Sequence, residues 1–283
     1  MLDNFLKMIK IIFISDIVGK IGRQAVAQYL PKLKKQYAPD LVIANAENLA
    51  HGIGFTGKTL EDVRSAGIDI FTSGNHAWKK AGSDEILNDP NWNIIRPANY
   101  KAKKSGVGFK EVTLTGKKKS DKKIGEIKLF VVNLLGRVFI EEKLESPFVV
   151  MESIIKDNPG ALFLVDFHGE ATSEKTAFAN YFDGQITAVI GTHTHVQTSD
   201  ERILGGGTAF ITDAGMVGYH DSVIGANKEQ IYNLFLETGK SSKKHDVPEA
   251  GECQFNGVYL EIDEKNGKAK KIKRLNKILK IKQ

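Results

Sequence analysis

Residues 191–198 read GTHTHVQT and place His193 and His195 two positions apart, directly behind the apolar run 186–190. If that run is a β-strand, its period of two points both imidazoles to the same side of the chain. Two ring nitrogens aimed at one place suit a metal ion, because histidine is the commonest nitrogen ligand near pH 7. An H-x-H pair also occurs as packed or solvated histidines, so the rest of the chain decides between these interpretations.

The composition is ordinary for a globular protein. With 283 residues, 41% of them hydrophobic and 26% charged, the chain is long enough for one large core, so we expect a single domain over residues 1–283. Residues 1–7 would be an N-terminal extension, with Met8 as an alternative start. Cys253 is the single cysteine and cannot form an intramolecular disulfide, so we expect an apolar filler. No signal peptide or membrane-spanning run is present, which predicts a cytoplasmic protein without a membrane partner.

The positive charge of the chain is concentrated near its C-terminus. Nine Lys and Arg residues and no acids lie in residues 265–283, so the net charge of +6 becomes −3 for residues 1–264. A second lysine cluster, at positions 117, 118, 119, 122 and 123, falls at an expected hairpin tip. We interpret both as solvated lysine faces, because no aromatic residues are interleaved with the lysines. RNA binding through the basic C-terminal segment, residues 264–283, is the alternative.

Apolar runs alternate with segments of helical period. Continuous apolar strands joined by helices are typical of an α/β fold whose sheets are covered by helices. We expect loops at the glycine-rich segments 205–207 and 215–225. The expected strands are 10–15, 40–44, 68–72, 106–115, 126–133, 161–165, 186–190, 208–212 and 257–262, and the expected helices are 24–37, 59–65, 81–87, 146–156, 173–182 and 228–236.

Five of the expected strands end at side chains that can bind metal. Ligand sites of α/β proteins lie at the carboxyl ends of strands, so we expect these residues to meet. Each one alone could be a turn former, a surface acid or a core histidine, but together they would be unpaired buried polar groups unless a cation binds them. The residues are Asp16; Glu47 with Asn48; Asn75 with His76; His168; and His193 with His195.

This donor set of carboxylate, carboxamide and imidazole contains no thiolate. It suits manganese, iron or zinc and not a structural cysteine site. Even seven of these eight residues would exceed the needs of one tetrahedral ion. The sequence therefore predicts two neighbouring ions bridged by a carboxylate.

The order of these motifs resembles the calcineurin-like metallophosphoesterase superfamily. The spellings DIVGKIGR, NAEN, SGNHAW, DFHGEATSEK and GTHTHVQT resemble its YmdB-type branch, the 2′,3′-cyclic-nucleotide phosphodiesterases, from Met8 to about Ile262. The resemblance implies a two-sheet sandwich of mixed β-sheets flanked by helices, in four layers α/β/β/α. One departure from the superfamily is Val18, which stands where a histidine ligand is usual. Asn48 would replace that ligand, as in the branch.

The resemblance also implies which residues hold each ion. Glu47 would bridge a first ion, held with Asp16, Asn48 and His195, and a second ion, held with Asn75, His168 and His193. His76 would not be a ligand but the general acid. Iron or manganese is favoured, with zinc or magnesium as alternatives, and we expect a homo-oligomer.

The mechanism that follows is hydrolysis of a small phosphodiester. Two ions would activate a bridging hydroxide for attack on phosphorus, and His76 would protonate the departing oxygen. The resemblance implies that the 2′ bond of a 2′,3′-cyclic nucleotide breaks and a 3′-phosphate remains. Arg23 could bind phosphate at a helix start, although close packing of that helix on the sheet explains the segment equally well. Glu170 and Thr172 could hydrogen-bond the ligands.

Other functions remain open. One is a regulatory RNA-binding protein that uses the basic C-terminal segment and keeps a structural or vestigial metal site. Another is a broader phosphomonoesterase or a protein phosphatase, or an amidohydrolase-like enzyme, although the G-N-H and G-x-H-x-H motifs favour phosphoesters. A dinucleotide-binding protein is excluded because no G-x-G-x-x-G motif follows a strand.

Overall fold

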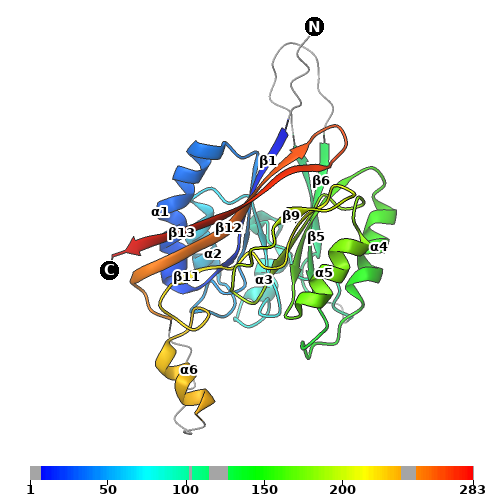
Figure 1. The fold of residues 1–283 in the computed structure, drawn as a ribbon. Coiled ribbons are helices and arrows are strands. Elements are labelled where there is room, and N and C mark those ends of the chain that lie inside the picture. The colour runs from blue at the N-terminus through cyan, green and yellow to red at the C-terminus, as the bar shows by residue number, and fades with distance from the viewer. Residues whose placement is uncertain (1–7, 102–103, 115–126, 237–246, 283) are drawn as a thin grey trace.

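Two β-sheets pack face to face, and helices cover their outer sides (Figure 1). The computed structural model describes residues 8–101, 104–114, 127–236 and 247–282. The extension predicted at residues 1–7 and the lysine cluster at 117–123 lie outside these residues. Within them, no helix combines the length and the apolar character needed to cross a membrane.

The first sheet has seven strands and is mixed. Its centre is β1 (Met8–Ile14), which runs parallel to β3 (Leu41–Asn45) on one side and antiparallel to β12 (Gly251–Asp263) on the other. β3 continues the parallel arrangement to β4 (Ile70–Thr72). The remaining strands are β2 (Asp16–Ile17), β11 (Met216–Tyr219) and β13 (Ala269–Ile281).

The second sheet has six strands in the order β5-β6-β7-β8-β10-β9. The four central strands are parallel, and the antiparallel strands β5 and β9 form the edges. This sheet is therefore mixed as well. Its strands are β5 (Phe109–Leu114), β6 (Ile127–Leu135), β7 (Leu162–His168), β8 (Ala188–Thr192), β9 (Arg202–Ile203) and β10 (Ala209–Ile211).

Helices α1 and α2 lie outside the first sheet, and α4 and α5 lie outside the second (Figure 1). α6 stands apart from both sheets and has no buried residue. The helices are α1 (Gly19–Tyr37), α2 (Gly57–Arg64), α3 (Ser83–Asn88), α4 (Pro147–Asp157), α5 (Thr172–Tyr181) and α6 (Lys228–Phe235), with a 3₁₀ turn at Pro90–Trp92.

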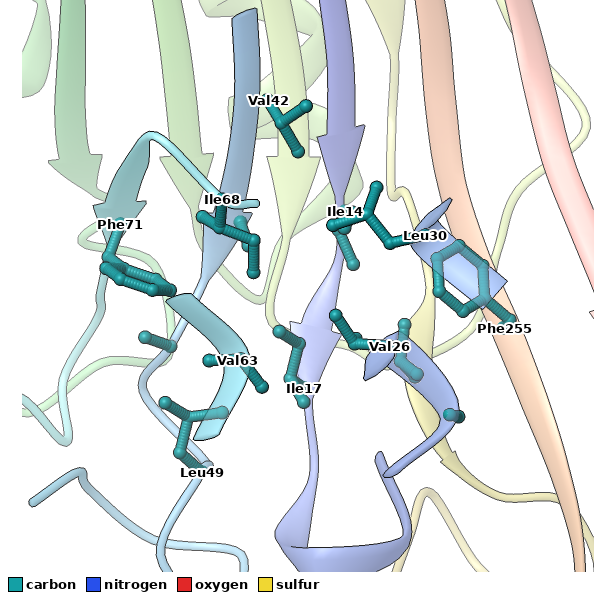
Figure 2. Packing of buried hydrophobic residues seen from close by; sticks show 14 of the residues in the cluster. Ile14, Ile17, Val26, Leu30, Val42, Leu49, Val63, Ile68, Phe71 and Phe255 are labelled. Carbon is teal, nitrogen blue, oxygen red and sulfur yellow. The ribbon is translucent and has the colours of Figure 1, made fainter. Parts of the chain in front are cut away.

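Three apolar clusters fill the spaces between the four layers. The period of two along β1 sends Ile14 toward Val26 of α1 and Val63 of α2, as Figure 2 shows, and sends Phe13 toward the other sheet. Along β6 the same alternation sends Val131 to the space between the sheets and Val132 toward α4 and α5. The four-layer α/β/β/α fold is confirmed.

The structure has one strand that was not predicted and another in a segment that was predicted as a loop. The basic C-terminal segment contains the long strand β13, which pairs with β12 along residues 251–262. The many lysines of β13 made its apolar face hard to recognise in the sequence. On that face Leu275, Leu279 and Ile281 are buried. The segment 215–225, predicted as a loop, contains β11.

The first helix also differs from its prediction, because α1 begins at Gly19 and not at residue 24. Glycine is a poor helix former, so the helical period appeared to start later. Gly22 is needed there for packing, since a Cβ at this position would lie 2.3 Å from the carbonyl oxygen of Val217. Close packing of the helix start on the sheet accounts for this glycine. Cys253 is fully buried, as expected for an apolar filler, and burial raises the pKa of its thiol to about 12.

Candidate metal centre

The carboxyl ends of strands from both sheets bring the predicted ligands together. β1 leads directly to Asp16, β3 to Glu47 and Asn48, and β4 to Asn75 and His76. From the second sheet, β7 ends on His168, and His193 and His195 follow β8. Residues almost two hundred positions apart in the sequence thus face one another.

Glu47, His168 and His193 form the inner half of the centre. One potential ligand atom from each lies within 4.8 Å of the others. His168 Nε2 is 3.2 Å from Glu47 Oε2 and 3.1 Å from His193 Nδ1. Glu47 and His168 are almost completely buried. These three residues could share one cation.

Asp16, Asn48 and His195 form the other half. His195 Nε2 lies 3.1 Å from Asn48 Nδ2 and 3.8 Å from Asp16 Oδ1. Asn48 Nδ2 also donates to Glu47 Oε1 at 3.1 Å, so Asn48 and Glu47 connect the two halves. The oxygen of Asn48 faces His76 Nδ1 at 2.9 Å, and the amide would have to turn over for that oxygen to bind a cation.

Two buried oxygens in the centre lack a hydrogen bond from any described residue, namely Asp16 Oδ1 and Asn75 Oδ1. A buried acceptor without a donor is costly, and a cation would satisfy it. The oxygen and nitrogen donors suit manganese, iron or zinc. The residues present therefore fit the metal ions that the sequence predicts.

Two histidines are held in the tautomer that ligation requires. His195 Nδ1 donates to the carbonyl oxygen of Ile224 at 2.7 Å. His168 Nδ1 donates to Thr192 Oγ1 at 2.9 Å, and this hydroxyl donates to Asp166 Oδ1 at 2.6 Å. When either ring is neutral, as ligation requires, its Nε2 keeps its lone pair and faces the centre.

Asp166 organises a buried network that we did not predict. It accepts hydrogen bonds from the hydroxyls of Thr72 and Thr192 and, at 3.0 Å, from Asn45 Nδ2. Asn45 in turn accepts from the backbone N–H of Glu47 at 3.0 Å. Burial raises the pKa of Asp166, although these hydrogen bonds and His168 oppose the rise. The signal in the sequence was a polar residue inside an apolar run, as in LVDFH and VIAN.

The loop that carries His193 and His195 has a strained backbone. Their φ angles are 101° and 65°, a region that residues other than glycine rarely adopt. The buried ion pair of Lys175 and Asp213, 2.8 Å apart, braces this loop. Lys175 Nζ donates to the carbonyl oxygen of Thr192 at 2.8 Å, and Asp213 accepts from the N–H of Thr194 at 3.0 Å. This pair was not predicted from the sequence.

The electrostatics of the centre without metal ions favour the binding of positive charge. Burial opposes ionisation of Glu47, but the nearby His168 ring holds the pKa of Glu47 well below its usual range. Burial also opposes protonation of His168, yet Glu47 raises the pKa of His168 to about 9. Burial raises the pKa of Asp16 to about 6, although His195 and His168 oppose the rise.

The other histidines of the centre favour the neutral form. Burial, together with the charge on His168, lowers the pKa of His193 to about 3. Burial also lowers the pKa of His76, an effect that Glu47 opposes. His76 Nδ1 is 3.4 Å from Glu47 Oε1. A neutral His193 can act as a ligand at neutral pH.

The three residues predicted to contact the substrate or to support the ligands have different surroundings. Glu170 Oε2 lies 3.2 Å from His193 Nε2, so this exposed carboxylate does reach the centre. Thr172 is exposed at the first position of α5. Arg23 donates to the carbonyl oxygen of Leu49 and, at 3.0 Å, to the carboxylate of Asp62. These two bonds use Nε and Nη1 of the guanidinium, and phosphate binding by Arg23 stays a prediction.

Known proteins resemble this chain along nearly its whole length. The sequence model of the family described as YmdB-like protein matches residues 12–275. A 2′,3′-cyclic-nucleotide 2′-phosphodiesterase of Bacillus subtilis (strain 168) is 41% identical over 94% of this chain and 96% of its own. A crystal structure of a novel phosphatase from Mycoplasma pneumoniae superposes with a TM-score of 0.86 at 37% identity, over 98% of this chain and 96% of that one. A hypothetical protein from Thermus thermophilus gives a TM-score of 0.84 at 34% identity, over 95% of this chain and 99% of that one.

Proposed function

Because this chain belongs to the YmdB-like protein family, we propose that it is a metal-dependent phosphoric diester hydrolase that acts on 2′,3′-cyclic nucleotides. The observation that carries the proposal is the meeting of six oxygen- and nitrogen-bearing side chains from both sheets. Among the described residues, the buried Oδ1 atoms of Asp16 and Asn75 have no hydrogen-bond partner. The Bacillus subtilis relative, by its name, acts on this class of substrate.

The ligands divide into two sets that share Glu47. Asp16, Asn48 and His195 would hold one ion, and Asn75, His168 and His193 would hold the other. Iron or manganese suits these donors best. When bound, two such ions supply an activated water and positive charge that offsets the charge developing on the phosphate. Glu170 would orient His193 through its contact with Nε2.

His76 would give the proton to the departing ribose oxygen. The Asn48 amide lies 2.9 Å from Nδ1 of this ring. If the amide turns over to offer its oxygen to an ion, its Nδ2 would donate to His76 Nδ1 and leave Nε2 to hold that proton. An imidazole whose pKa is lowered is a stronger acid once protonated, which suits transfer to an alkoxide. Breaking the 2′ bond would leave a 3′-phosphate.

We expect His76→Ala to lower kcat for 2′,3′-cyclic AMP by about 100-fold or more, because general acid catalysis contributes roughly 10²–10⁴-fold. The metal content should stay that of the wild type, since His76 is not among the proposed ligands. The measurement is steady-state kinetics with elemental analysis of the same sample. Unchanged turnover would remove His76 from the mechanism.

A panel of substrates tests the proposal as a whole. The manganese-loaded protein should hydrolyse 2′,3′-cyclic AMP to 3′-AMP in preference to 3′,5′-cyclic AMP, phosphomonoesters and RNA. Preference for a monoester or for 3′,5′-cyclic AMP would contradict the proposed substrate but not the proposed class of reaction. Absence of hydrolysis of every phosphoester by the metal-loaded protein would overturn the class.

A further inference from the structure

A cavity of about 520 Å³ lies beside the metal centre and has His195 in its wall. This volume is in the range of small-molecule sites. The cavity opens between the loop that follows β8, the loop that follows β11, and strands β12 and β13. We call it the side pocket; its wall includes His195, Val196, His220, Ile224, Gln254 and Ile278.

Exposed apolar side chains from three separate segments converge on the side pocket. Val196, Ile224 and Ile278 are 58%, 53% and 39% exposed, respectively. Single exposed apolar residues are common on proteins, whereas a group of them around a hollow marks a binding site. The side pocket therefore offers apolar surface to a ligand.

Ile224 is in contact with both the side pocket and a proposed metal ligand. Its φ angle is 48°, which is strained for a β-branched residue. In this conformation its carbonyl oxygen accepts the Nδ1 hydrogen bond of His195, while its side chain lines the side pocket. Strain of this kind persists where the surrounding structure imposes it, commonly at ligand sites.

The polar groups of the side pocket include the amides of Gln254 and Asn276 and the ring of His220. No described wall residue is a carboxylate, a lysine or an arginine. A second cavity, of about 740 Å³ beside α1, has instead charged residues of both signs in its wall, among them Lys20 and Glu249. Apolar walls with a few amide groups suit a flat, uncharged heterocycle better than such a charged wall does.

We infer that the side pocket binds the nucleobase of the phosphodiester whose phosphate lies at the metal centre, an inference that rests on the proposed function. The exposed apolar side chains would cover the faces of the base, and the amides and His220 would meet its polar edge. The pocket would thus set the preference for nucleotides over simple diesters.

The test compares two substrates of the manganese-loaded protein: 2′,3′-cyclic AMP, and bis-p-nitrophenyl phosphate, which has no nucleobase. The variant is Ile278→Asp, because Ile278 lies on the edge strand β13 and is partly exposed. Its kcat/KM for cyclic AMP should fall at least tenfold further than its kcat/KM for bis-p-nitrophenyl phosphate, chiefly through KM. Lys280→Asp, on the same strand and outside the pocket wall, is the matched control and should stay within about twofold on both substrates.

Equal losses of kcat/KM on the two substrates, or no loss on either, would contradict nucleobase binding in the side pocket and would leave the proposed function intact. If the wild type hydrolyses no phosphodiester, the proposed function fails, and calorimetry with adenosine then tests the pocket alone. Binding of adenosine by the wild type and its loss in Ile278→Asp would uphold the pocket. Equal binding by both proteins, or no binding by either, would overturn it.

Discussion

Gly74 lies where any side chain would collide with the centre. A Cβ at this position would be 2.1 Å from Glu47 Oε2 and 2.4 Å from His168 Nε2. The absence of a side chain lets the backbone between β4 and Asn75 approach the proposed bridging carboxylate. The glycine of the G-N-H motif is thus explained by the space it leaves free.

We expect Gly74→Ala to lower the affinity for Mn²⁺ by about tenfold or more, because Glu47 and His168 must move away from the added methyl group. Changes next to metal ligands typically cost about 10–100-fold in affinity. Titration calorimetry with Mn²⁺ measures the effect. Gly205→Ala is a suitable control, since the nearest atom to its Cβ is 3.9 Å away, at Asp183. Equal affinities of Gly74→Ala and the control would contradict this view of Gly74.

At the scale of elements, α5 supports the loop after β8 through Lys175. This lysine is fully buried and joins the carbonyl oxygen of Thr192 to Asp213. Asp213 also accepts from the N–H of Thr194, so the pair holds the backbone on both sides of His193. Through one buried lysine, α5 thereby fixes the position of two proposed ligands.

Replacing Lys175 by Met should lower the free energy of unfolding by about 3–5 kcal/mol, because Asp213 would be left as an unpaired buried charge. The Mn²⁺ affinity should fall as well. In the double variant Lys175→Met/Asp213→Asn no buried charge is unpaired, so stability should largely recover while the affinity stays low. Chemical denaturation and calorimetry measure the two effects. Recovery of both together would mean that the pair serves stability alone.

The elements that the sequence predicted best are those that carry the centre. Apolar strands with a polar residue at their ends have a short-range signal, so the ends at Asp16, Glu47 and His168 were found to within a few residues. β13 was missed because its lysine content outweighed the apolar alternation. The Lys175–Asp213 pair had no signal, since its two residues lie 38 positions apart and meet only in the folded chain.

For the molecule as a whole, the two sheets bring Glu47 and His168 together, so that the centre keeps a proton on His168 when no metal is bound. The pKa of His168 is then about 9 because Glu47 outweighs the effect of burial. The C-terminal lysines belong to a strand paired with β12, so deleting them would also remove part of the first sheet. RNA binding by this segment and formation of a homo-oligomer stay predictions.

The pH dependence of metal binding follows from that protonation. A metal ion needs the neutral form of His168, so below about pH 9 its binding must release the proton of this ring. Asp16, with a pKa of about 6, and His193, with a pKa of about 3, have already lost their protons at pH 7. The apparent affinity for Mn²⁺ should therefore rise by about tenfold per pH unit from about pH 7 to about pH 9 and level off above. Calorimetry in buffers of different ionisation enthalpy would detect the released proton, and a flat profile would contradict this assignment.

If side chains from both sheets hold two cations in one centre, the ions can be located by anomalous diffraction at the manganese edge from crystals grown with Mn²⁺. We expect two peaks, one near Asp16, Asn48 and His195 and one near Asn75, His168 and His193, with Glu47 between them. A single peak, or none at these residues, would contradict this expectation.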